Sequence, residues 1–287
     1  MSLALTVDRV VLWCSLNRDG LRRVGLIAAL ALFAGGLFLS IRANPDVLGQ
    51  LSVAPLLVLL CVALPIGLAL SAADFQVMGA MSSCRVGFWP AVRICLYSRA
   101  ANMLPIPGSL AVRMGALKVH GVTFRRSGGL IILFTLIWGG IGFCFSALWL
   151  ALQAPWELSA IFGLIGLAIL AGCTYFAHRT GLSLPLFLAA AVYRFGLVVV
   201  EAYALMMGIH AIGAAAEYQQ AAILVVASFL SSVVPAGIGV RETLIAILSP
   251  MAGIDPATGF LAATTTRIVG MAFLALLTAI SYAASRR

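Results

Sequence analysis

Residues Ala221–Leu248 read AAILVVASFLSSVVPAGIGVRETLIAIL, a stretch that is apolar over most of its length. Pro235, Gly237 and Gly239 divide it into two halves of about 12 residues, whereas a helix that spans a bilayer needs about 20. Two half-helices that meet at a break are tolerated at membrane depth only where they are buried in protein or line a cavity. The stretch therefore predicts a re-entrant helical hairpin.

A second stretch, Arg85–His120, has the same character. It is apolar but carries five basic residues, and Pro90, Pro105 and Pro107 interrupt it, with Gly108 directly after the last proline. Neither stretch fits a simple spanning helix. We interpret this one as a second broken hairpin.

The composition is that of a membrane protein. Of 287 residues, 63% are hydrophobic and 9% are charged, whereas about a quarter of the residues in a soluble protein are charged. A chain this apolar cannot cover a globular surface with polar groups, which excludes a soluble enzyme, a disordered chain and a secreted disulfide scaffold. The net charge of +9 comes mostly from basic residues that flank apolar runs, as the positive-inside rule requires. No nucleic-acid partner is therefore expected.

We predict an all-α polytopic membrane protein, with about six transmembrane helices plus the two re-entrant hairpins in a single membrane domain over residues 1–287. The runs that approach or exceed the length needed to span are Val24–Ile41, Leu51–Ala73, Leu130–Leu152, Leu158–Phe176, Leu184–Met207 and about Phe260–Ala283.

The distribution of basic residues predicts the topology. Residues 1–23, an amphipathic N-terminus with four arginines, are placed in the cytoplasm, and the seven basic residues of segment 74–128 then lie on the same side. Arg179, Arg286 and Arg287 follow them. Both termini are therefore expected to be cytoplasmic.

The two hairpins share a sequence pattern. PGSLAVR at 107–113 matches PAGIGVR at 235–241 at the proline and at the final Val-Arg pair. Downstream, GVT at 121–123 corresponds to GID at 253–255, where Thr123 or Asp255 can cap the next spanning helix and Pro256 can occupy its first position.

Each half thus contains two spans, a broken hairpin and a third span. Because three spans is an odd number, the second half (158–283) must be inverted relative to the first (24–152). Inverted repeats are the plan of many secondary transporters, whose sites lie near the midplane where broken helices meet. The alternative is coincidence, since short Pro/Gly/Arg matches are common in a glycine-rich chain.

Catalytic signatures are mostly absent from the sequence. It contains no G-x-S-x-G, H-E-x-x-H or P-loop motif, and its three histidines fall at predicted membrane boundaries. No closely spaced carboxylates or cysteines have metal-binding spacing. We therefore expect a protein that is not an enzyme, with no catalytic residue, no metal and no cofactor.

Charges at membrane depth are the functional candidates, because their burial in lipid is costly. Arg194 and Glu201 are seven residues apart and share a helical face, so they could approach each other directly or through water. The alternative is that they form a structural pair between helices. Arg267, in the last span, could bind substrate, extend to the interface or pair with Glu201.

Arg113 and Arg241 each follow a break by a turn or two, near the start of a half-helix. Free N–H groups and the positive end of the helix dipole favour an anion there, and an arginine adds a planar fork that suits phosphate. Glu242 could pair with Arg241 or with a cationic headgroup. The alternative for Arg113 is an ordinary cytoplasmic charge, and for Arg241 a structural one.

Segment Ser228–Arg267, with VPAGIGVRE at 234–242, Gly253-Ile254 and Arg267, resembles the C-terminal half of the lysylphosphatidylglycerol synthase transmembrane-region family. Leu104-Pro105 through Arg113, followed by Gly121-Val122, is similar to the family's first motif, although this chain has Leu110 where the family often has an acidic residue. The resemblance implies a flippase-like membrane domain of a bacterial or archaeal inner membrane. The chain lacks the family's soluble synthase domain, so aminoacyl transfer is not expected.

The resemblance and the charges together favour a protein that translocates or binds an anionic phospholipid, or a polyprenyl or hopanoid-type lipid. Its partners would be membrane lipids. The first alternative is a non-transporting scaffold for an envelope-biosynthesis enzyme, and the second is a lipid-pyrophosphate phosphatase. The substrate-binding candidates are Arg113, Arg241, Arg267, Glu242, Arg194 and Glu201, and the glycines of the breaks would let the backbone approach the headgroup.

Overall fold

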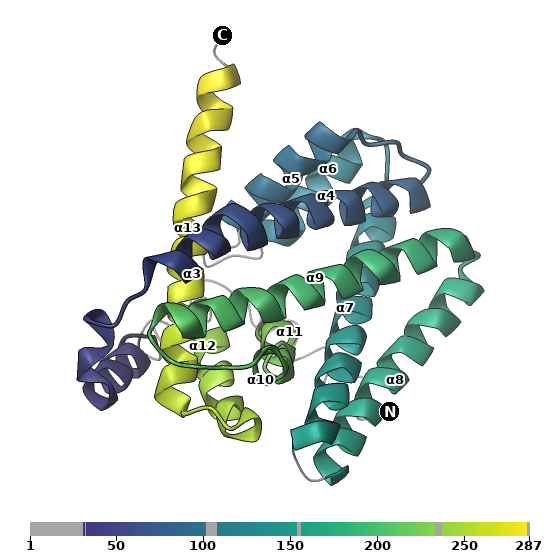
Figure 1. Cartoon of the computed structure of the whole chain (residues 1–287). Coiled ribbons are helices and arrows are strands. Elements are labelled where there is room, and N and C mark those ends of the chain that lie inside the picture. The colour runs from purple at the N-terminus through teal and green to yellow at the C-terminus, as the bar shows by residue number, and fades with distance from the viewer. Residues whose placement is uncertain (1–30, 32, 102–107, 154–155, 233–236, 286–287) are drawn as a thin grey trace, which may run out of the picture.

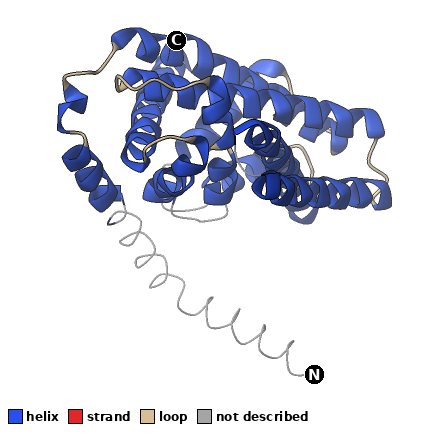
Figure 2. Cartoon of the chain, turned by 60° about the horizontal axis from the view of Figure 1, so that its bottom comes forward, coloured by secondary structure: helices blue, strands red, loops and turns tan. Residues whose placement is uncertain are grey.

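The computed structural model describes residues 31, 33–101, 108–153, 156–232 and 237–285, and the structural statements below concern those residues. Within them the chain forms helices and contains no strand (Figure 2). The predicted all-α class is therefore confirmed.

Short connections join the helices, which begin with Phe33–Ala43. In chain order the others are η1 (Pro45–Leu48), α3 (Val53–Val58), the π-helical segment η2 (Leu59–Ala63), α4 (Leu64–Met81), α5 (Phe88–Ala101), α6 (Gly108–Val119), α7 (Phe124–Gln153), α8 (Trp156–Arg179), α9 (Leu184–Ala211), α10 (Tyr218–Ile223), α11 (Val226–Ser232), α12 (Gly237–Leu248), η3 (Ser249–Ala252) and α13 (Pro256–Ser285).

Five of these helical segments are long and apolar enough to cross a membrane, which makes the chain a multi-pass α-helical membrane protein. They are Val53–Met81, Phe124–Gln153, Trp156–Arg179, Leu184–Ala211 and Pro256–Ser281, and each coincides with one of the predicted runs. The first part of the remaining predicted run, Val24–Ile41, lies outside the described residues, and its second part falls in the helix Phe33–Ala43.

The helix starts after the two hairpins have the predicted caps. Oγ1 of Thr123 accepts a hydrogen bond from the N–H of Arg126 at 3.4 Å, and Oδ2 of Asp255 accepts one from the N–H of Thr258 at 3.0 Å. Pro256 is the first residue of α13, where its missing N–H costs nothing. These caps let α7 and α13 begin earlier than hydropathy alone indicates.

α4 and α9 pack side by side through the middle of the molecule, and α7 and α8 form a long helical pair beside them (Figure 1). The α7–α8 pair is close because of small residues. A Cβ atom on Gly140 would lie 2.8 Å from Cγ of Leu170, and one on Gly166 would lie 2.8 Å from the carbonyl oxygen of Gly140. Small residues at helix contacts are the usual means of close packing in membranes, where apolar burial contributes little.

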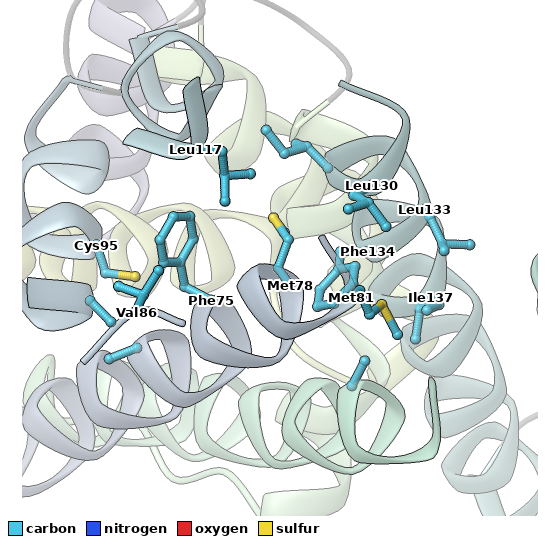
Figure 3. Packing of buried hydrophobic residues seen from close by; sticks show 14 of the residues in the cluster. Phe75, Met78, Met81, Val86, Cys95, Leu117, Leu130, Leu133, Phe134 and Ile137 are labelled. Carbon is cyan, nitrogen blue, oxygen red and sulfur yellow. The ribbon is translucent and has the colours of Figure 1, made fainter. Parts of the chain in front are cut away.

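The largest hydrophobic core fills the space between α4, the α5–α6 hairpin and α7. Phe75, Met78 and Met81 project from α4 toward Leu117 of α6 and Phe134 of α7 (Figure 3). All five side chains are buried. This core fixes hairpin α5–α6 against α4 and so positions the charged residues that the hairpin carries.

The two broken stretches fold as adjacent helices. α6 lies beside α5, and α12 packs against both α11 and α13. Gly108, the first residue of α6, approaches α5 so closely that a Cβ atom on it would overlap the carbonyl oxygen of Ala101. A glycine is therefore required where the two helices of the first hairpin meet.

Corresponding helices after the two breaks have equal lengths. α6 and α12 each contain 12 residues, and α7 and α13 each contain 30. The turns before the hairpins also correspond. Ser83, with φ of +61°, follows α4, and Gly213, with φ of +79°, occupies the equivalent place after α9.

Candidate functional site

Charged side chains from both hairpins and three spanning helices gather inside the helical bundle. The charged cluster, as we call it, consists of three acidic and five basic residues: Asp74, Glu201 and Glu242, with Arg99, Arg113, Arg194, Arg241 and Arg267. Three ion pairs link the acidic residues to three of the arginines.

The first pair joins two spanning helices. Nε of Arg194 on α9 donates to Oδ1 of Asp74 on α4 at 2.9 Å, and Nη2 lies 2.7 Å from Oδ2. The Asp74 side chain is 1% exposed and that of Arg194 is 9% exposed. The guanidinium also lies over the ring of Phe134, 5.5 Å from its centroid. A two-point contact in this apolar setting is a structural connection between α4 and α9.

The second pair connects α12 to α9. Nη2 of Arg241 donates to Oε1 of Glu201 at 3.2 Å, and Nε donates to Oγ of Ser228 on α11 at 2.8 Å. Both charged side chains of this pair remain partly accessible, with exposed fractions of 17% and 23%. The pair is therefore open to exchange with another anion.

The third pair connects α12 to α13. Nε of Arg267 lies 2.8 Å from Oε1 of Glu242, whose side chain has no exposed surface. The other carboxylate oxygen accepts the backbone N–H of Gly239 at 3.0 Å. Gly239 has φ of +85°, in the left-handed region that favours glycine, and this conformation turns its N–H toward the carboxylate.

The first hairpin binds its arginines differently. Nε of Arg113 on α6 donates to Oγ of Ser98 on α5 at 3.1 Å. That hydroxyl also lies 2.6 Å from Oγ of Ser109. Nη2 of Arg99 donates to the carbonyl oxygen of Gly67 at 2.9 Å and to Oγ of Ser71 at 2.7 Å. These acceptors are all uncharged.

Arg113 and Arg241 have corresponding environments. In each hairpin, an arginine in the second helix donates through Nε to a serine hydroxyl near the end of the first helix, Ser98 or Ser228. The two arginines that the sequence singled out are thus held in the same way, although only Arg241 also has a carboxylate partner among the described residues.

The ion pairs in the structure differ from some of the pairings that the sequence left open. Arg194 does not pair with Glu201, because Asp74 from α4 takes the guanidinium instead. Arg267 forms an ion pair with Glu242. Glu242 does not contact its neighbour Arg241 as an ion pair, since adjacent residues of a helix point in different directions.

The residues of the breaks are only partly described. Pro105, Pro107 and Pro235 lie outside the described residues. Gly108 begins α6 and Gly237 begins α12, as the pattern of the breaks predicts.

Sequence reasoning missed Asp74 and Arg99. Asp74 follows the apolar run Leu51–Ala73 and was expected to lie in the cytoplasmic segment, whereas α4 continues through it to Met81. The available signal was the pattern LPIGLALSAADFQVMGAM, which is helical and apolar on both sides of the aspartate. In the sequence, Arg99 is one of the five basic residues of the stretch Arg85–His120. Its contacts with α4 place it in the charged cluster.

The two ends of the charged cluster are electrostatically connected. Arg113 lies within electrostatic range of Asp74, Arg99 and Arg194, and Arg99 within range of Glu201. Because Glu201 pairs with Arg241, charges of the first hairpin and of the second meet across α9. Glu201 is therefore the residue through which the two halves of the charged cluster interact electrostatically.

No protein-family description and no curated protein sequence matches this chain.

Proposed function

We propose that this chain is an inverted-repeat membrane protein that binds a lipid with an anionic headgroup and moves it between leaflets. The proposal has six spanning helices, two re-entrant hairpins and both termini in the cytoplasm of a bacterial or archaeal inner membrane. It includes membership of the lysylphosphatidylglycerol synthase transmembrane-region family, on the motifs described above.

The matched geometry of the two halves supports the repeat. Equal lengths of α6 and α12, and of α7 and α13, accompany the shared Pro and Val-Arg pattern. A repeat that contains an odd number of spans reverses its orientation in the membrane. The hairpins would then enter from opposite leaflets and meet near the midplane, where transporters of this plan bind their substrates.

The single observation that carries the lipid proposal is the convergence of both hairpin arginines on one charged cluster. Arg113 and Arg241 are held alike by serines, and the intervening charges link them across α9. A headgroup that reached this cluster from either leaflet would meet a guanidinium fork, which is suited to phosphate oxygens.

The partly exposed pair Arg241–Glu201 indicates how a headgroup would be exchanged. A phosphate that bound Arg241 would displace Glu201, while the more buried pair of Glu242 and Arg267 would keep α12 attached to α13. Arg241 is thus proposed to bind and release substrate, and Arg267 to support the site. Transport would be downhill unless Glu201 couples it to an ion.

A flipping assay tests this function. The purified protein is reconstituted in vesicles with fluorescent phosphatidylglycerol or a fluorescent prenyl phosphate, and movement between leaflets is measured as loss of outer-leaflet fluorescence after reduction. Wild type should accelerate movement of at least one lipid over protein-free vesicles. Arg241→Gln should abolish the acceleration.

The matched control is Arg179→Gln, which removes an exposed arginine from the end of α8. Within the described residues, its side chain forms a hydrogen bond to Tyr175 on the same helix. Its rate should equal that of wild type. If no lipid moves faster with wild type, or if Arg241→Gln transports normally, the translocation proposal is overturned and the non-transporting scaffold becomes the better explanation.

A further inference from the structure

The charged cluster has more positive than negative charge. Its five arginines face three carboxylates, and each carboxylate has one arginine at 3.2 Å or less. Arg99 and Arg113 remain, and among the described residues no carboxylate lies within 4.0 Å of either guanidinium. In the described part of the chain, the positive charges of Arg99 and Arg113 therefore exceed the negative charges that are paired with arginines.

Both arginines still have hydrogen-bond donors to offer. Arg99 uses Nη2 for its contacts with Gly67 and Ser71, and Arg113 uses Nε for its contact with Ser98. The N–H groups on Nε and Nη1 of Arg99, and on both Nη atoms of Arg113, make no hydrogen bond with the described part of the chain. A guanidinium presents these donors as a planar fork.

The two guanidinium groups also repel each other, because they lie within electrostatic range. Arg113 is repelled further by Arg194. Placing like charges together in an apolar bundle is unfavourable unless an anion joins them. The corresponding arginine of the other hairpin, Arg241, has its carboxylate in Glu201, so the shortage of negative charge is confined to the first hairpin.

We propose that Arg99 and Arg113 together bind a doubly charged terminal phosphate, a phosphomonoester or diphosphate, on the headgroup of the transported lipid. This assignment rests on the proposed lipid function and narrows its substrate class. Two negative charges match the two uncompensated arginines, whereas a phosphodiester such as phosphatidylglycerol carries only one. The hydroxyls of Ser98 and Ser109, already 2.6 Å apart, lie beside Arg113, and the hydroxyl that accepts in this contact keeps a proton that can be donated to a phosphate oxygen.

Binding affinity as a function of pH tests the charge of the ligand. The protein in detergent is titrated with geranylgeranyl phosphate, with the uncharged alcohol geranylgeraniol and with dioleoyl-phosphatidylglycerol. Because the second pKa of a phosphomonoester is about 6, the monophosphate should bind about tenfold more tightly at pH 8 than at pH 5. Phosphatidylglycerol should bind weakly and without this dependence.

Variants assign the two charges. Arg99→Gln and Arg113→Gln should each weaken monophosphate binding by about tenfold at pH 8 and flatten its pH dependence. Arg99→Lys, which keeps the charge, should retain most of that dependence. Arg93→Gln, which removes an exposed arginine from the same helix α5, should bind like wild type.

The outcomes separate this inference from the proposed function. Equal, pH-independent affinity for monophosphate and phosphatidylglycerol overturns the dianion assignment, even if vesicles show lipid movement. Tight monophosphate binding that needs both arginines supports the assignment, even if no lipid moves and the transport proposal fails. Inorganic phosphate that binds as tightly as the prenyl phosphate overturns the lipid source of the anion.

Discussion

Asp74 and Arg194 join α4 to α9 by two contacts, at 2.9 Å and 2.7 Å, although 120 residues separate them in the chain. Both side chains are buried. The pair forms only when the two helices have packed together, so it reports on the tertiary structure rather than on either helix alone. It also lies within electrostatic range of Arg113, beside the proposed phosphate site.

Breaking this pair should destabilise the protein strongly. Arg194→Gln leaves the Asp74 carboxylate buried without its cation, which costs about 3–5 kcal/mol in comparable buried pairs. The measurement is the melting temperature in detergent, with folded yield as a second readout. The double variant Asp74→Leu/Arg194→Met should recover most of the stability, because an apolar pair needs no counter-charge. A single variant as stable as wild type would contradict a structural role for the pair.

Glu201 and Glu242 should have separable effects on stability and transport. Glu242→Gln removes a carboxylate that binds both Arg267 and the N–H of Gly239, so it should lower stability by about 1–3 kcal/mol. Glu201→Gln acts on a partly exposed pair and should cost less than about 1 kcal/mol. Thermal unfolding should show that the Glu201→Gln variant is folded. The flipping assay should show a changed rate of lipid movement for the same variant.

Gly108→Ala should displace the first hairpin. The new methyl group would overlap the carbonyl oxygen of Ala101, so α6 must move away from α5 and shift Arg113 relative to Ser98. We expect a lower melting temperature and loss of prenyl phosphate binding. The control is Gly115→Ala in the same helix, where nothing lies within 4 Å of the new atom. That variant should gain up to about 1 kcal/mol from helix propensity.

Cysteine accessibility should distinguish re-entrant hairpins from spanning segments. In a cysteine-free background, Arg85→Cys and His120→Cys flank the first hairpin, while Glu217→Cys and Asp255→Cys flank the second; all four positions are exposed. An impermeant thiol reagent applied to intact cells should label the last two and leave the first two unlabelled until the membrane is opened. Labelling of only one member of either pair would mean that the stretch crosses the membrane.

The helices were predictable because they depend on local patterns. Long apolar runs predicted five of the spans, and Thr123 and Asp255 predicted the starts of α7 and α13. Prolines and glycines predicted where the two hairpins divide. In each case the physical signal lies within a few residues of the feature it determines.

The charge partners were not predictable from the sequence, because they depend on helix packing. Arg194 and Glu201 share a helical face of α9. Helix α4 places Asp74 against Arg194, and α12 places Arg241 against Glu201. Asp74 itself was placed in the cytoplasmic segment 74–128, because the predicted apolar run ends at Ala73. The arginine that neutralises it comes from a distant part of the chain.

The π-helical segment η2 affects which way Asp74 faces. It lies between α3 and α4 within the continuous span Val53–Met81, upstream of Asp74. One added residue rotates every later side chain of a helix by about 100° around its axis, and a π turn is how a helix absorbs such an insertion. The rotation of α4 about its axis is thus set several turns before Asp74, by a segment that carries no charge. This rotation directs the Asp74 carboxylate toward Arg194 instead of toward lipid.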